Sequence, residues 1–158
     1  MSNPHPNLRF KMLKDSNSIL ARYIIKRHPN GFLSATVTGE RGYGKSMYCY
    51  KTMAEIYHRL DGCTEEEAYK KALDHMIFST DQFITLIDKS IETKEVIPVL
   101  TLDDSSVYFC SYNFFTDMKR VIQLHAMFDL IRTSVTGLLL NCPNRKMLLS
   151  FMRSYDDF

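Results

Sequence analysis

The hydrophobic residues of the chain fall into two patterns: short apolar runs, and longer stretches with helical spacing. Each short run is rich in apolar and β-branched residues and is bounded by polar or turn-forming residues, which is typical of strands buried in a sheet. We therefore predict four strands, at residues 32–38, 75–79, 97–102 and 135–140. Four such strands are enough to form the sheet of one domain.

The stretches between these runs have apolar residues at i, i+3 and i+4, the repeat of a helix with one buried face. Thr64 and Glu67 form the signature of a capping box at the start of one of these stretches. In the first stretch, the face that we expect to be buried consists of Ile19, Leu20, Tyr23 and Ile24. We predict helices at residues 16–26, 45–60, 64–73, from 80 or 81 onward, 117–133 and 145–153.

Strands and helices thus alternate along the chain, which predicts an α/β fold with a mainly parallel sheet and right-handed crossovers. A chain of 158 residues has the size of one domain, and we assign residues 16–158 to it. Residues 1–15 contain two prolines and little periodicity, so we expect a loose basic arm there.

The net charge is +2, but the charged residues are unevenly distributed along the chain. Residues 1–30 carry a net charge of +5, and residues 31–158 carry a net charge of −3. A basic arm on a mildly acidic body favours nucleic acid or another acidic partner. A solvated N-terminal helix explains the same distribution equally well.

Two further features of the sequence bear on the cellular location of the protein. No apolar run approaches the ~18 residues of a membrane-spanning helix, and Met1 to Lys14 lack the apolar core of a secretory signal. The four cysteines are scattered and form no C-x-x-C pair, so we expect reduced thiols rather than zinc ligands. These features predict a cytoplasmic protein without a membrane partner.

A glycine-rich segment between the first strand and the next helix matches the phosphate-binding P-loop, or Walker A motif, G-x-x-x-x-G-K-[ST]. Its backbone N–H groups can surround anionic oxygens, and the helix adds the positive end of its dipole. Lys45 is expected to reach the β- and γ-phosphates, and Ser46 to bind Mg²⁺. A turn without a ligand is the alternative, but the flanking strand and helix are the context that the motif requires. The predicted nucleotide-binding residues are Gly39, Glu40, Arg41, Gly42, Tyr43, Gly44, Lys45, Ser46 and Met47.

Acidic and amide residues follow two of the other predicted strands. Asp103 comes after the third strand, where the carboxylate of a Walker B segment holds the water shell of Mg²⁺. In many P-loop ATPases the next position is a catalytic glutamate that orients or deprotonates the attacking water. By this resemblance Asp104 would have that role, and slow turnover is expected because its side chain is one methylene shorter. A turn or a helix cap is the alternative for this pair. Asn141 ends the fourth strand and would touch the γ-phosphate or the lytic water, unless it only forms a turn before Pro143.

With these segments the chain resembles the additional-strand division of P-loop ATPases, which includes the AAA+ and RecA-like families. More narrowly, it is similar to small ATP-binding proteins encoded by crenarchaeal plasmids and viruses. The resemblance is carried by the segments GERGYGKSMY, LDDSSVYF and IRTSVTGLLLNCPN, and it covers about residues 18–154.

The resemblance implies a three-layer P-loop NTPase fold in which the 135–140 strand lies between the P-loop strand and the Walker B strand. The 76–79 strand would lie on the other side of the Walker B strand. The resemblance also implies a sensor 1 role for Asn141. In a homo-oligomer, Arg153 would be the arginine finger that reaches a neighbour's nucleotide.

The expected function is that of an ATPase that binds and hydrolyses Mg-ATP, acting as a homo-oligomer on nucleic acid. A P-loop kinase that phosphorylates a nucleotide or small molecule is one alternative. A nucleotide-gated interaction protein with little turnover is another. The sequence shows no arginine-rich lid of the kind that kinases usually carry, which favours the ATPase.

Overall fold

The computed structural model describes residues 18–105, 118–148 and 150–154. The predicted N-terminal arm, residues 1–15, lies outside these residues, as does most of the serine- and aromatic-rich segment that follows Asp104. No helix in the described part of the chain is long and apolar enough to cross a membrane.

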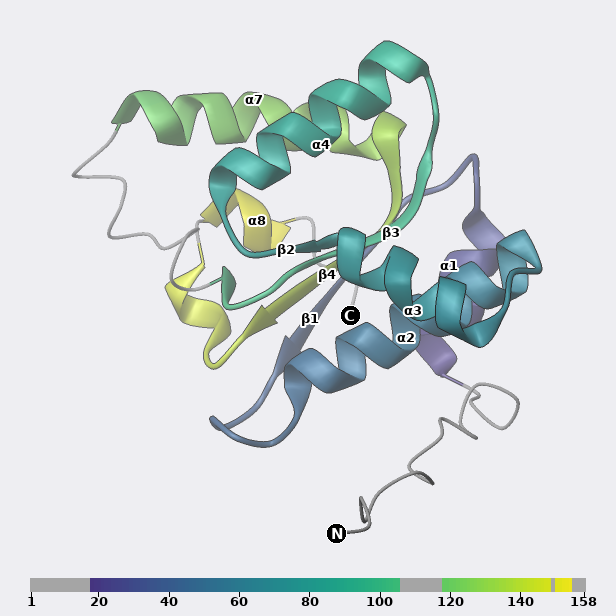
Figure 1. Cartoon of the computed structure of the whole chain (residues 1–158). Helices are drawn as coiled ribbons and strands as arrows, with labels where there is room; N and C mark the ends of the chain where they lie inside the picture. Colours follow the sequence, from purple (N-terminus) through teal and green to yellow (C-terminus); the bar gives the residue numbers. More distant parts are fainter. Residues whose placement is uncertain (1–17, 106–117, 149, 155–158) are drawn as a thin grey trace, which may run out of the picture.

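The predicted α/β fold with a parallel sheet is confirmed. All strand pairs in the described residues are parallel, and the strand order is β1-β4-β3-β2 (Figure 1). The fourth strand therefore lies between the first and the third, as the resemblance implied. The strands are β1 (Leu33–Thr38), β2 (Met76–Ile77), β3 (Ile97–Leu102) and β4 (Val135–Cys142).

Helices cover both faces of this sheet, so the domain has three layers (Figure 1). On one face lie α1 (Ile19–Arg27), α2 (Lys45–Asp61) and α3 (Glu65–Asp74). On the other face lie α4 (Thr80–Thr93), α7 (Met118–Ser134) and α8 (Ser150–Ser154). The predicted capping box begins α3, because Thr64 Oγ1 accepts from the Glu67 N–H and the Glu67 carboxylate accepts from the Thr64 N–H.

Two hydrophobic cores follow from the two-residue repeat of the central strands. In β4, Leu138 and Leu140 point to the core under α4 and α7, whereas Leu139 points to the core under α1 and α2. Tyr57 of α2 donates its hydroxyl to the Val99 carbonyl at 2.8 Å, and Thr101 donates to the Met53 sulfur at 2.9 Å. These contacts place α2 directly over β3.

The predicted buried face of the first helix is wrong in part. Ala21 and Ile24 are buried, whereas Ile19 and Tyr23 are 59% and 43% exposed. The rotation of α1 follows from two tertiary contacts. The Ser18 N–H donates to the buried Glu55 carboxylate at 3.2 Å. Ile24 packs against Gly137 of β4, which has no side chain.

The predicted helix at residues 145–153 is also corrected. It consists of a short 3-10 helix, η1 (Arg145–Met147), and the separate α8. Asn144 caps η1 by accepting from the Lys146 N–H at 2.9 Å. Leu148 then adopts an extended backbone and is fully buried in the core under α4 and α7. Burial of this one side chain interrupts the helix.

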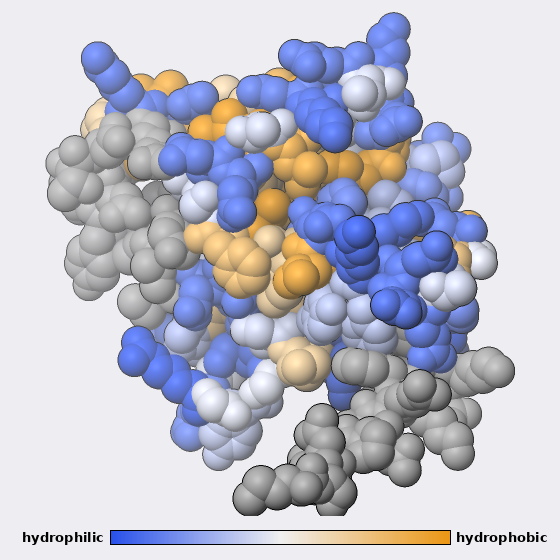
Figure 2. Space-filling model, in the orientation of Figure 1, coloured by the Kyte–Doolittle hydropathy of each residue, from blue (hydrophilic) through white to orange (hydrophobic). Residues whose placement is uncertain are grey.

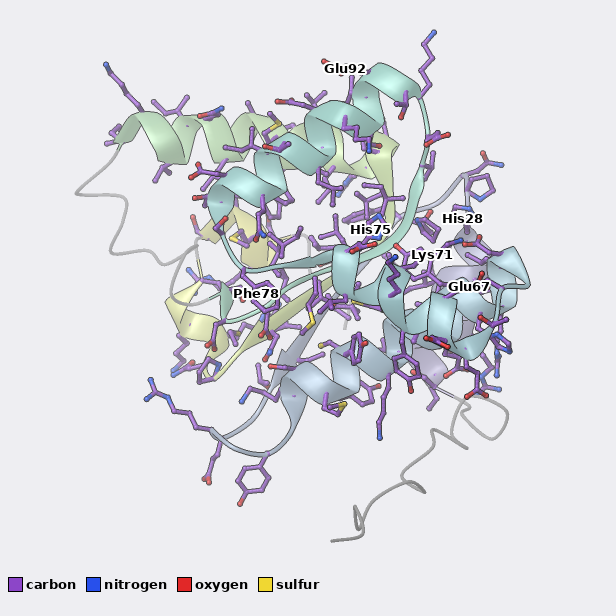
Figure 3. All side chains as sticks on the ribbon, viewed as in Figure 1. His28, Glu67, Lys71, His75, Phe78 and Glu92 are labelled. Atoms are coloured by element: carbon purple, nitrogen blue, oxygen red, sulfur yellow. The ribbon has the colours of Figure 1, made fainter. Side chains whose placement is uncertain are left out.

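The far edge of the sheet carries exposed apolar residues. The edge strand β2 has only two residues, and a hollow of about 600 Å³ beside it is lined in part by Leu73, Phe78 and Leu86. Figure 2 shows apolar side chains gathered on this face, and Figure 3 labels Phe78 among them. This surface lies at the edge opposite β1, away from the glycine-rich segment.

Candidate functional site

The glycine-rich segment connects the end of β1 to the start of α2. Gly42 and Gly44 have φ angles of 85° and 76°, which residues with a side chain rarely adopt. Gly44 is the N-cap of α2 and supplies no side chain to cap it. The first N–H groups of a 17-residue helix therefore face the loop without a side-chain acceptor at the cap.

Sheet register brings the predicted polar residues to the same place. In the parallel pair of β3 and β4, Leu102 is opposite Leu140, so the next residues, Asp103 and Asn141, are neighbours. The two-residue repeat turns both toward α2, since Thr101 and Leu139 already face that side.

Three side chains from three different elements meet here. Ser46 Oγ donates to Asp103 Oδ1 at 2.8 Å, and Asn141 Nδ2 donates to Ser46 Oγ at 2.9 Å and also to Asp103 Oδ1. Asn141 is 2% exposed, and its Oδ1 atom has no hydrogen-bond partner among the described residues. We call Ser46, Asp103 and Asn141 the polar cluster.

A pocket of about 720 Å³ lies between the glycine-rich segment and the ends of β3 and β4. Lys45 lies on its wall, and its ammonium group donates to the Glu40 carbonyl across the loop at 2.9 Å. Of the residues predicted to form the site, the pocket is lined by Arg41, Gly42, Gly44, Lys45, Ser46, Met47, Asp104 and Asn141. Gly39, Glu40, Tyr43 and Asp103 do not line it, although Asp103 bonds to Ser46 on its wall, and the Tyr43 side chain is 76% exposed.

Asp103 and Asp104 have different environments. Asp103 is half-buried and belongs to the polar cluster, whereas Asp104 is exposed on the pocket wall with a left-handed φ of 45°. A residue other than glycine in this conformation is uncommon. The next residue, Ser105, is buried and donates to the Asn141 carbonyl at 2.8 Å. Sequence reasoning missed Ser105, although its position directly after two acidic residues at a strand end was a usable signal.

The predicted catalytic residue Arg153 is not on the wall of this pocket. It lines a second pocket of about 750 Å³, which shares Pro143 with the first. The Arg153 carbonyl accepts from the Arg145 guanidinium at 3.3 Å. Contact of Arg153 with a neighbouring subunit's nucleotide stays a prediction.

The donor set fits Mg²⁺ better than a transition metal. A hydroxyl and a carboxylate, Ser46 and Asp103, are the hard oxygen ligands that Mg²⁺ takes together with phosphate oxygens and water. In the described part of the chain, no group of three or more histidine, cysteine or acidic side chains is placed to hold a metal ion.

Cys49 lies beneath the site but is not a nucleophile. Burial, and then the nearby negative charge of Asp103, raise the pKa of the Cys49 thiol to about 12. The thiol is therefore protonated at neutral pH, and its role is packing under α2.

A viral protein is among the known proteins that are similar to this chain. No family model matches the chain, and no solved structure matches it significantly. The chain is 28% identical over 149 residues to the uncharacterized protein B-251 of Sulfolobus spindle-shape virus 1. The match covers 92% of this chain and 58% of the viral protein, so the chain spans little more than half the length of that relative. The viral origin of this relative fits the predicted origin in an archaeal virus or plasmid, and the resemblance to ATP-binding proteins stays a prediction.

Proposed function

We propose that this chain is a P-loop ATPase that binds and hydrolyses Mg-ATP in the pocket beside the glycine-rich segment. The observation that carries the proposal is the polar cluster at the first turn of α2. A P-loop serine, a strand-end aspartate and a strand-end asparagine meet within hydrogen-bond distance, although 95 positions separate the serine from the asparagine. A turn that binds no ligand would not require these three side chains to lie together.

The residues of the candidate site have distinct tasks under this proposal. The backbone N–H groups at the start of α2 and the Lys45 ammonium bind the phosphates, because both present positive charge to the pocket. Ser46 and Asp103 hold Mg²⁺, which when bound neutralises negative charge on the phosphate oxygens. Asn141 holds these two ligands in position by donating to both.

Hydrolysis requires a group that orients water toward the γ-phosphate. Asp104 suits this task because it is exposed on the pocket wall, one residue beyond the cluster. Its carboxylate is available to a water molecule, whereas that of Asp103 already accepts two hydrogen bonds.

The first experiment measures ATP binding with and without Mg²⁺, and phosphate release without an acceptor. Lys45→Ala is expected to abolish binding or turnover while the circular dichroism spectrum stays unchanged. Lys70→Ala, at an exposed position on α3, is the control for loss of one positive charge. Wild-type hydrolysis by Lys45→Ala would show that the site is assigned wrongly. Phosphate transfer that requires an acceptor would favour the kinase, and tight binding without release would favour the nucleotide-gated interaction protein.

Three further properties belong to the proposal. Action on nucleic acid, assembly as a homo-oligomer and a cytoplasmic location stay predictions. Deletion of residues 1–14 tests the arm, since it removes three basic residues and is expected to weaken DNA binding and make it less dependent on salt.

A further inference from the structure

A second pocket lies beside the candidate nucleotide site. It has a volume of about 750 Å³ and is formed by the end of β1, the turn after β4, η1 and α8. Pro143 lies on the walls of both pockets. No residue of the glycine-rich segment lines the second pocket, and no residue of the polar cluster does.

The second pocket is strongly basic. Arg145, Lys146 and Arg153 line it, and none of the lining residues in the described part of the chain is acidic. Among the described residues, neither Lys146 nor Arg153 makes an ion pair. Thr38 and Ser150 add hydroxyl groups to the wall. Cations together with neutral donors, without a carboxylate, are the surroundings that a phosphate group requires.

The openness of this surface argues for an extended ligand. Most of the described lining residues are exposed, including Lys146 and Ser150, and no aromatic side chain is among these described residues. Pockets for small molecules are instead mostly apolar and bury most of the ligand. A strand of nucleic acid needs less enclosure, because salt-dependent contacts to successive phosphates supply its affinity.

We propose that this basic pocket binds the sugar–phosphate backbone of a nucleic-acid strand. The contact is to phosphates rather than to bases, because the described residues of the wall offer charge and hydroxyl groups but no ring on which a base could stack. The inference gives the nucleic-acid partner of the proposed function a site on the folded domain. It does not depend on ATP hydrolysis.

The test measures the binding of a fluorescent oligothymidylate of about 20 nucleotides by anisotropy, without ATP, between about 50 and 200 mM salt. The double variant Lys146→Ala/Arg153→Ala is expected to bind on the order of tenfold more weakly at low salt. The slope of log affinity against log salt should become shallower by about 1.4, since each lost phosphate contact contributes about 0.7. Lys70→Ala/Lys89→Ala removes two exposed charges outside the pocket and is expected to bind like the wild type.

Two conservative variants and one competitor make the result independent of folding and of the ATPase proposal. Arg153→Lys keeps the charge and is expected to retain most of the affinity, and Lys146→Gln changes one exposed side chain and is expected to lose part of it. Inorganic tripolyphosphate at the same phosphate concentration is expected to compete poorly, because it lacks the length of the strand. Unchanged binding by the double variant, or an equal loss in the control, would overturn the proposal. Complete displacement by tripolyphosphate would also overturn it and indicate a site for small phosphates.

Discussion

Asn141 Nδ2 lies 2.9 Å from Ser46 Oγ, so a residue at the end of β4 fixes the first turn of α2. The same amide donates to Asp103 at the end of β3. One buried side chain therefore connects the two central strands to the helix that follows the glycine-rich segment. The positions of the two proposed magnesium ligands depend on this amide.

Removal of the Asn141 amide should lower the stability of the fold. We expect Asn141→Ala to lower the free energy of unfolding by about 1–3 kcal/mol, because Ser46 and Asp103 lose a buried donor. Urea denaturation measures this change. Gln123→Ala, which truncates an exposed amide on α7, should stay within about 0.5 kcal/mol of the wild type. Equal stabilities of both variants would contradict a structural role for the cluster.

Asp103 and Asp104 should have separable roles. Asp103→Ala is expected to weaken Mg²⁺-dependent ATP binding by about tenfold or more, because it removes a proposed ligand together with the acceptor of two hydrogen bonds. Asp104→Asn should leave binding intact and slow hydrolysis by about 10²-fold, as for a group that positions or deprotonates water. Nucleotide titration and phosphate release measure the two effects. The division of roles is wrong if both variants lose affinity equally.

Gly137 is expected to be intolerant of a side chain. A Cβ atom at this position would lie 2.7 Å from Ile24 Cδ1 and 2.9 Å from Ile24 Cγ2. We expect Gly137→Ala to destabilise the fold by about 1–3 kcal/mol through overpacking between β4 and α1. In the Ile24→Ala background the same change should cost less, because the obstructing atoms are gone. The same cost in both backgrounds, measured by urea denaturation, would exclude this contact as the cause.

His28 should make stability depend on pH. Its Nδ1 atom lies 2.9 Å from Thr136 Oγ1, and burial lowers the pKa of the imidazole below its usual value, although the charge of Asp61 acts in the opposite direction. Because the unfolded chain then binds a proton more readily than the folded one, stability should fall as the pH drops below about 6.5. The loss should level off once the folded form is protonated as well.

Urea denaturation between about pH 5 and pH 8 measures this dependence. His28→Gln removes the titrating group, so the part of the slope that His28 contributes should disappear. An identical pH dependence in the variant and the wild type would show that His28 does not titrate differently in the two states.

Much of the fold was determined by local pattern. The apolar runs at 33–38 and 97–102 form strands with almost the predicted bounds, and the capping box at Thr64 begins a helix as expected. These predictions succeed because they rest on local requirements. Strands and helices bury apolar residues at a repeat of two or 3.6, and the first N–H groups of a helix need hydrogen-bond acceptors close by in the sequence. The candidate site residues could also be named in advance, since a loop between strand and helix and the ends of parallel strands all lie at one edge of the sheet.

What the sequence by itself determined, then, is the order of strands and helices, the glycine-rich segment and the polar residues at the strand ends. The tertiary structure alone decided which of these residues touch. The register of Leu102 with Leu140 places Asp103 beside Asn141, and no local pattern specifies a register between segments that are 38 positions apart. In the same way, the absence of a side chain at Gly137 set the rotation of α1, and burial of Leu148 divided the last helix. Such contacts depend on packing between distant segments, which a single residue's propensity does not encode.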